Sequence, residues 1–235
     1  MANHGYINRD GKNLSAFHIV RGLKACYGLS TPLALFLSYV GFAILKRVRP
    51  IDLYHIGKHG AVEHDASLAH HNTPMGHKYA PIEIDHTLVT ELINDAKYTQ
   101  DGAPNAEAGK LMSAVDVARA RVRREKLSKP LDGVHAEIAR GEMAIILGVW
   151  ETKSNDKVGV PSEWLQRWIG HEKLPEGWKP THKQGLLDTV KRAKAIRAAM
   201  EEMRSAEAKN APMTPISLDE KTSSPTSGDS VEAKL

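Results

Sequence analysis

Residues 134–150 read VHAEIARGEMAIILGVW, and this stretch decides what kind of fold the chain adopts. It is predicted to form a helix whose second half, from Met143 to Trp150, is almost wholly apolar. A helix that is apolar on nearly every face has to be buried on most sides. The stretch therefore predicts a helical core in the middle of the protein.

Helical patterns continue on both sides of this stretch. Cap residues precede several of them, among them Ser15, Asp85 and Ser113. Only residues 82–84 and 157–160 alternate as short strands would. We expect an all-α, single-domain, mainly helical fold. Helices are predicted over residues 15–28, 32–45, 86–97, 114–126, 163–168 and 183–208.

The C-terminal segment differs in composition from the rest of the chain. From about residue 210 it is rich in Pro, Ser, Thr, Asp, Glu and Lys, as in TSSPTSGDS at 222–230. Such a segment cannot bury enough apolar surface to order itself. We expect one domain over residues 1–208 and a disordered tail over residues 209–235.

Composition sets limits on localisation and partners. The 235 residues are 41% hydrophobic, and the formal net charge is +4. The printed N-terminus, MANHGYINRDGKN, lacks the apolar run of a signal peptide. The longest apolar run, residues 32–45, is shorter than the ~20 residues of a membrane span. A buried core helix is the favoured reading of this run and membrane association is not expected, although Lys46, Arg47 and Arg49 behind it leave interfacial anchoring open.

A basic cluster follows Ser113 along the predicted helix. Its favoured interpretation is a solvated helix face. The cluster lacks the aromatic side chains on which bases stack, so no nucleic-acid partner is expected, and a basic binding module is the weaker alternative. The cluster consists of Arg119, Arg121, Arg123, Arg124, Lys126 and Lys129.

The single cysteine, Cys26, lies on an apolar stretch. It can form no disulfide within the chain, and a lone thiol in such a setting is usually a small buried hydrophobe. No Cys/His spacing typical of a zinc site accompanies it.

Residues 61–71, AVEHDASLAHH, gather side chains that carry chemistry. If this segment is helical, Glu63, His64 and Ser67 lie within one turn, and the carboxylate and hydroxyl can share a hard cation such as Mg²⁺. Asp65 beside His64 can hold the imidazole in one tautomer, which makes His64 a candidate acid–base group. The plain alternative is a polar loop in which Asp65 caps the following turn. A transition-metal site is a further alternative, built on His55, His59, His64, His70, His71 and His77.

Glu142 is the second candidate for proton chemistry. It stands at the start of the apolar half of the 134–150 helix. One interpretation places it at a helix start, where the dipole favours its charge. The other encloses it beside a cavity, where burial would suit a proton carrier.

Several motifs together resemble the chloroperoxidase-type heme-thiolate peroxidases, the family of fungal haloperoxidases and unspecific peroxygenases. Residues 2–11, ANHGYINRDG, resemble the family's ANHGY(I/L)PRDG motif, and Glu63–Leu68 matches its EHD-x-S motif. Glu142 follows at the place of the family's distal glutamate. Residues 162–178, SEWLQRWIGHEKLPEGW, resemble its late tryptophan-containing segment.

The resemblance implies a helical fold around heme b and an enzyme that uses hydrogen peroxide to oxidise a small organic molecule or a halide. Glu142 would be the distal acid–base group, tuned by His64, which Asp65 orients. The side chains of Glu63 and Ser67 and the backbone carbonyl of His64 would hold Mg²⁺ or Mn²⁺ beside a heme propionate.

The resemblance also implies an axial cysteine in a Pro-Cys-Pro motif just before Ala-Asn-His-Gly. In this sequence Met1 stands at that point, and Cys26 is no substitute by position. We expect the motif to lie upstream of the printed start, and a chain extended to include it to gain a Soret band with heme. The alternative is a catalytically silent scaffold without the axial thiolate.

Overall fold

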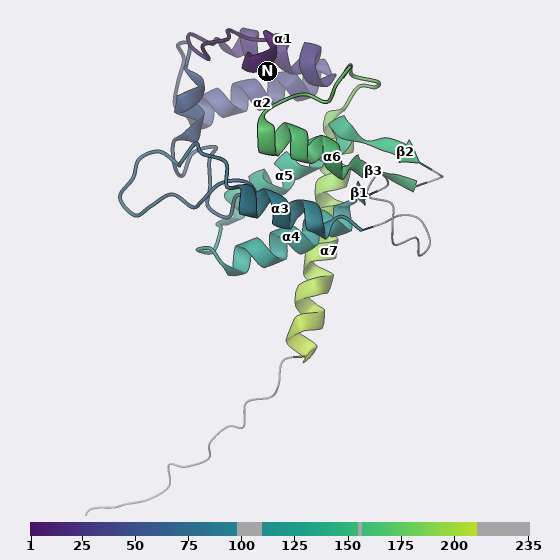
Figure 1. The fold of residues 1–235 in the computed structure, drawn as a ribbon. Coiled ribbons are helices and arrows are strands. Elements are labelled where there is room, and N and C mark those ends of the chain that lie inside the picture. The colour runs from purple at the N-terminus through teal and green to yellow at the C-terminus, as the bar shows by residue number, and fades with distance from the viewer. Residues whose placement is uncertain (98–109, 155–156, 211–235) are drawn as a thin grey trace, which may run out of the picture.

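In the computed structural model, the structure is described over residues 1–97, 110–154 and 157–210 (Figure 1). Helices dominate these ranges, which confirms the predicted all-α class. Short 3₁₀ helices cover Ala2–His4 and Leu53–Gly57, and a π-helical turn covers Gln166–Gly170. The α helices are α1 (Ala16–Tyr27), α2 (Thr31–Ile44), α3 (His86–Asp95), α4 (Ala114–Lys126), α5 (Gly133–Trp150), α6 (Ser162–Leu165) and α7 (Leu186–Asn210).

Side-chain caps fix where most of these helices begin. The predicted caps Ser15, Asp85 and Ser113 each accept a backbone N–H of the first turn, and Ser113 forms a reciprocal capping box with Asp116. Asp132 caps α5 in the same way by accepting from two backbone amides. Each cap satisfies a donor that the helix leaves unpaired, so the predicted caps Ser15, Asp85 and Ser113 are confirmed. Ser162, expected to cap a short helix, is instead the first residue of α6 and makes no cap bond.

A three-stranded antiparallel sheet accompanies the helices. Its order is β1 (Leu111–Met112), β3 (Lys157–Pro161), β2 (Thr152–Ser154), with Met112 opposite Val160 and Lys153 opposite Val158. The strand predicted at residues 157–160 is confirmed. The strand predicted at residues 82–84 is wrong: this segment is a loop before α3, and the Asp85 N–H donates to the carbonyl of Ala69.

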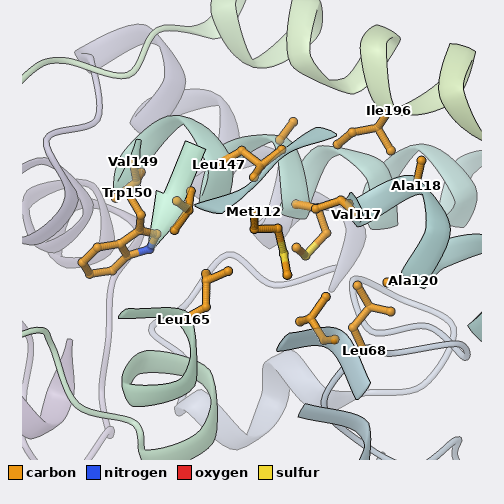
Figure 2. Close-up of a cluster of buried hydrophobic side chains, with 14 of the residues drawn as sticks. Leu68, Met112, Val117, Ala118, Ala120, Leu147, Val149, Trp150, Leu165 and Ile196 are labelled. Atoms are coloured by element: carbon orange, nitrogen blue, oxygen red, sulfur yellow. The ribbon is translucent and has the colours of Figure 1, made fainter. Parts of the chain in front are cut away.

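The core forms around α5, as residues 134–150 predict. Met143, Ala144 and Leu147–Trp150 are buried, and α7 packs along both α4 and α5. Figure 2 shows Leu147 and Trp150 in one cluster with side chains from α4, α7, β1 and the loop around Leu68. The ring of Trp150 lies 4.1 Å from that of Trp178. These contacts join the late tryptophan-containing segment to the central helix.

Two helices differ from the sequence expectation. α2 was expected to be a buried core helix, but it presents Leu35, Phe36, Tyr39 and Val40 to solvent, because α1 covers one of its faces. α7 begins at Leu186, three residues after the predicted start, and it buries Ile196 and Met200 while Leu187 is exposed.

Two further points concern membrane topology and domain limits. Within residues 1–97, 110–154 and 157–210, no helix combines the length and apolar character that a membrane crossing requires. The domain limit at residue 208 stays a prediction, since α7 continues to Asn210 and residues 211–235 of the expected tail lie outside the described residues.

Candidate functional site

The stretch Glu63–Ser67 is an irregular turn, so the condition that this segment be helical is not met. Ala66 within this stretch is buried and has a φ of 64°, in the left-handed region that interrupts a helix. The Ser67 hydroxyl accepts N–H groups from Ala69 and His70, both at 3.2 Å. The Asp65 carboxylate accepts the N–H of Thr73 at 3.2 Å. Side chains therefore hold this turn through local backbone bonds, as in the plain loop reading.

Two arginines of α4 hold this turn by hydrogen bonds to its backbone carbonyls. Arg121, only 1% exposed, donates to the carbonyl of Ala66 at 2.8 Å, and Arg124 donates to the carbonyl of Ser67 at 2.9 Å. Arg124 also donates to the side chain of Asn72, whose amide oxygen accepts the Ala66 N–H. The predicted solvated helix face is therefore wrong for these two residues, because their charges satisfy buried carbonyl groups.

His64 and Glu142 come together, although 78 positions separate them in the chain. The Nε2 of His64 lies 3.5 Å from a carboxylate oxygen of Glu142. The Nδ1 lies 2.7 Å from the backbone carbonyl of Asp65. A carbonyl only accepts hydrogen bonds, so Nδ1 carries a proton and Nε2 faces the carboxylate. The residue after His64 thus fixes its tautomer through the main chain, whereas the Asp65 carboxylate bonds elsewhere.

The electrostatic setting of His64 favours its protonated form. Burial alone lowers the pKa of the imidazole, but the bond to Glu142, the charge of that carboxylate and the Asp65 carbonyl together raise it above its ordinary value. Because Nδ1 is already protonated, a second proton on His64 makes an imidazolium that pairs with the Glu142 carboxylate. The two side chains can therefore share one mobile proton.

Glu142 sits in the middle of α5, ten residues into the helix. The helix-start reading is therefore wrong, and so is enclosure, because the side chain is 52% exposed. One side of the carboxylate contacts buried His64 and the other side is open. This arrangement suits a group that exchanges protons with a molecule arriving from outside.

His135 is a neighbour of this pair that the sequence analysis missed. Its ring centre lies 6.4 Å from that of His64, and its two nitrogens contact Asp132 at 2.7 Å and the carbonyl of Ala61 at 3.2 Å. The sequence could have indicated His135, because it lies seven residues before Glu142 and this spacing places both side chains on one face of α5. The Asp132 and Ala61 contacts tie the start of α5 to the segment before Glu63.

The turn also contains oxygen donors of the kind that a hard cation binds. The Glu63 carboxylate contacts the Nδ1 of His59 at 2.9 Å and the Thr73 hydroxyl at 3.5 Å. Glu63, Ser67 and the main chain of His64 offer the oxygen ligands that Mg²⁺ and Mn²⁺ accept. Among the described residues, no group of three His, Cys, Asp or Glu side chains is arranged to hold a metal, so the predicted transition-metal alternative is wrong there.

Cys26 is buried at the end of α1, as predicted for a small hydrophobe. Burial is the main cause that raises the pKa of its thiol, to about 11. The indole N–H of Trp178 donates to its carbonyl at 2.9 Å. An enclosed, protonated thiol has neither the charge nor the access of a metal ligand.

A cavity of about 320 Å³ lies elsewhere, where α5, α7 and β3 meet. Neither the His64–Glu142 pair nor Glu63 and Ser67 line it. Met112, Leu147, Val160, Glu151, Arg192 and Ala195 are among its lining residues.

The fold and the site together define a mainly helical protein in which a buried imidazole is paired with a solvent-accessible carboxylate. The model of the family "Peroxidase, family 2" matches residues 1–183, and the chain belongs to this family. The resemblance to chloroperoxidase-type peroxidases is thereby confirmed. The family defines the class of activity as a peroxidase, an oxidoreductase that uses peroxide and small-molecule substrates. Comparison with curated proteins gives no match.

Proposed function

We propose that this protein is a heme-dependent peroxidase or peroxygenase in which Glu142 is the acid–base group for hydrogen peroxide. The observation that carries the proposal is the 3.5 Å approach of Glu142 to the protonatable Nε2 of His64. An acid–base group must be reachable by its substrate and must have a partner that sets its charge. Glu142 meets both conditions, since it is half-exposed and paired.

Each residue has a distinct role in the proposed reaction. The Glu142 carboxylate takes a proton from hydrogen peroxide and returns it to the oxygen that leaves as water. The His64 imidazolium stabilises the carboxylate before the transfer, and the Asp65 carbonyl holds the ring in place. Heme, if bound, would supply the redox chemistry of the reaction. The oxidised substrate is a small organic molecule or a halide.

The turn at Glu63–Ser67 would hold the cation of the site. Glu63, Ser67 and the His64 carbonyl would bind Mg²⁺ or Mn²⁺ beside a heme propionate. The contact between His59 and the Glu63 carboxylate would then break, because the carboxylate would turn to the cation. The donor chemistry fits, because these ligands are all oxygen. The arginine anchors support this role, since they keep the turn in a fixed shape without using the Glu63 carboxylate.

The second candidate is a scaffold without catalysis. The enclosed thiol of Cys26 favours it, because a buried thiol is not accessible to the iron of a heme. A silent scaffold would keep the Glu63–Ser67 turn and its arginine anchors. It would not bind heme with a thiolate ligand.

The test uses the printed chain and the same chain preceded by a Pro-Cys-Pro segment, both titrated with hemin. We expect the extended chain to show a Soret band and a thiolate-type carbon monoxide spectrum. Glu142→Gln should then lower peroxide turnover by about 10²–10⁴-fold with unchanged heme content.

The matched control is Glu137→Gln, on the same helix and similarly exposed at 49%. It should keep turnover close to that of the parent. An extended chain that shows no Soret band of bound heme after unbound hemin is removed would refute heme use and favour the silent scaffold. Equal turnover in both glutamine variants would show that Glu142 is not the acid–base group.

A further inference from the structure

The exposed face of α2 is an apolar surface of the described fold that α1 leaves uncovered. Leu35, Phe36, Tyr39 and Val40 are between 38% and 55% exposed. At 100° per residue these four positions form one continuous stripe, while Leu33, Ala34, Ser38 and Phe42 form the buried side. A stripe of this kind on a surface helix usually marks a binding face.

The segment of the chain that contains this stripe carries only positive charges. Residues 11–51 contain six basic side chains and no Asp or Glu. The other 194 residues carry 26 basic and 28 acidic side chains, so the positive net charge of the chain arises from this one segment. The segment contains all of α1 and α2, which lie side by side at one end of the molecule (Figure 1).

The end of α2 adds a basic loop with an apolar tip. Lys46, Arg47 and Arg49 are exposed, and Val48 between them is fully exposed. Asp52, the nearest acidic residue in sequence, accepts the backbone N–H of Asn13 at 2.9 Å. A fully exposed valine flanked by cations has no role in the core. It can enter an apolar layer while its neighbours contact negative charge.

A small basic pocket adjoins this loop. Its volume is about 70 Å³, and its lining residues are Leu45, Arg47, His55, Lys58, Lys78 and Tyr79. Cationic groups thus converge where the apolar stripe ends. A phosphate-bearing headgroup would meet three basic side chains there.

We propose that this end of the molecule docks onto an anionic phospholipid surface, with the stripe of α2 in the outer acyl region and the loop 46–49 at the headgroups. The charge of the segment selects this partner, because anionic lipids attract clusters of Lys and Arg next to an amphipathic helix. α2 has 14 residues and extends for about 21 Å, too short to span the ~30 Å apolar layer. The helix therefore lies in the interface, and this proposal does not depend on heme or on catalysis.

The experiment is flotation of the full chain with vesicles. We expect binding to phosphatidylcholine vesicles containing 30% phosphatidylserine at low salt, and weak binding to pure phosphatidylcholine. Each basic side chain at the surface changes partition about fivefold, so the triple variant Lys46→Gln, Arg47→Gln, Arg49→Gln should bind about 100-fold more weakly. The double variant Phe36→Ser, Val40→Ser should lose at least about tenfold.

Matched controls come from other parts of the surface. The triple variant Lys126→Gln, Lys129→Gln, Lys194→Gln removes the same charge from exposed positions at the end of α4, just after it, and on α7. The double variant Leu187→Ser, Val190→Ser removes exposed apolar side chains from α7. Both controls should bind vesicles as the parent does, and all variants should keep the parent's helical circular dichroism.

Three outcomes would overturn the proposal. One is an equal loss of vesicle binding in the test and control variants, which would show that binding depends on net charge or on exposed apolar surface in general. Another is displacement by millimolar glycerophosphate, which would make the pocket a site for soluble phosphate. The last is a parent chain that is dimeric in light scattering, does not bind vesicles and becomes monomeric with Phe36→Ser, Val40→Ser, because a second copy would then cover the stripe.

Discussion

Replacing Arg121 with methionine tests whether a buried charge on α4 holds the turn that carries His64. The guanidinium donates to the carbonyl of Ala66 and, through two nitrogens, to the Glu125 carboxylate at 3.1 and 2.6 Å. Methionine fills most of the volume and provides no donor. The carbonyl of Ala66 is then left buried without its charged partner, and Glu125 keeps only its contact with Arg204.

The size of the effect follows from these contacts. Losing one charged donor to a buried carbonyl costs about 1.5–3 kcal/mol, and removing one partner of a buried ion pair costs about 3–5 kcal/mol. Because Arg204 still contacts Glu125, the lower end of the second range applies, and with the lost carbonyl bond we expect the free energy of unfolding to fall by about 4–5 kcal/mol. Urea denaturation followed by circular dichroism measures this difference.

Lys126→Met is the matched control on the same helix. Lys126 pairs with Glu207, but both side chains are at least half-exposed, and such pairs contribute about 0–1 kcal/mol. Amide hydrogen exchange at Ala66, Ser67 and Ala69 should also accelerate in Arg121→Met and stay unchanged in Lys126→Met. Equal effects of the two substitutions on stability, with no change in exchange at the turn, would refute the anchoring role of Arg121.

Two further predictions concern His64 and Cys26. The pKa of His64 is raised in the folded protein, so its contribution to stability is complete below the unfolded value of about 6.5 and is lost as pH rises through the folded value. The stability difference between the parent and Glu142→Gln should therefore shrink between pH 6 and pH 9, and a constant difference would contradict the pairing. Burial raises the pKa of the Cys26 thiol to about 11, so at pH 8 its alkylation should be at least about 100-fold slower in the folded chain than in guanidinium. Mass spectrometry after iodoacetamide measures this, and rapid modification of the native chain would show that the thiol is accessible.

Local patterns in the sequence were sufficient for the helical framework. A helix cap depends only on neighbours within one turn, so the sequence alone predicts the caps Ser15, Asp85 and Ser113. The sequence also predicts that Met143–Trp150 is buried, because nearly every face of that stretch is apolar. The motif around His64 and the position of Glu142 could be matched to a family, and the family model covers both.

Only the tertiary structure decided which charges are buried and which apolar faces are open. Arg121 looks like a solvated residue in its helix, and its burial depends on a carbonyl 55 positions away. His135 gains its place beside His64 in the same way, through contacts of α5 with a distant loop. α2 shows the opposite case, an apolar helix with an exposed face. An apolar helix is buried only where another element covers it, and α1 covers only one side of α2. The sequence thus determined which segments are helical, whereas the packing of segments far apart in the chain determined which of their side chains meet.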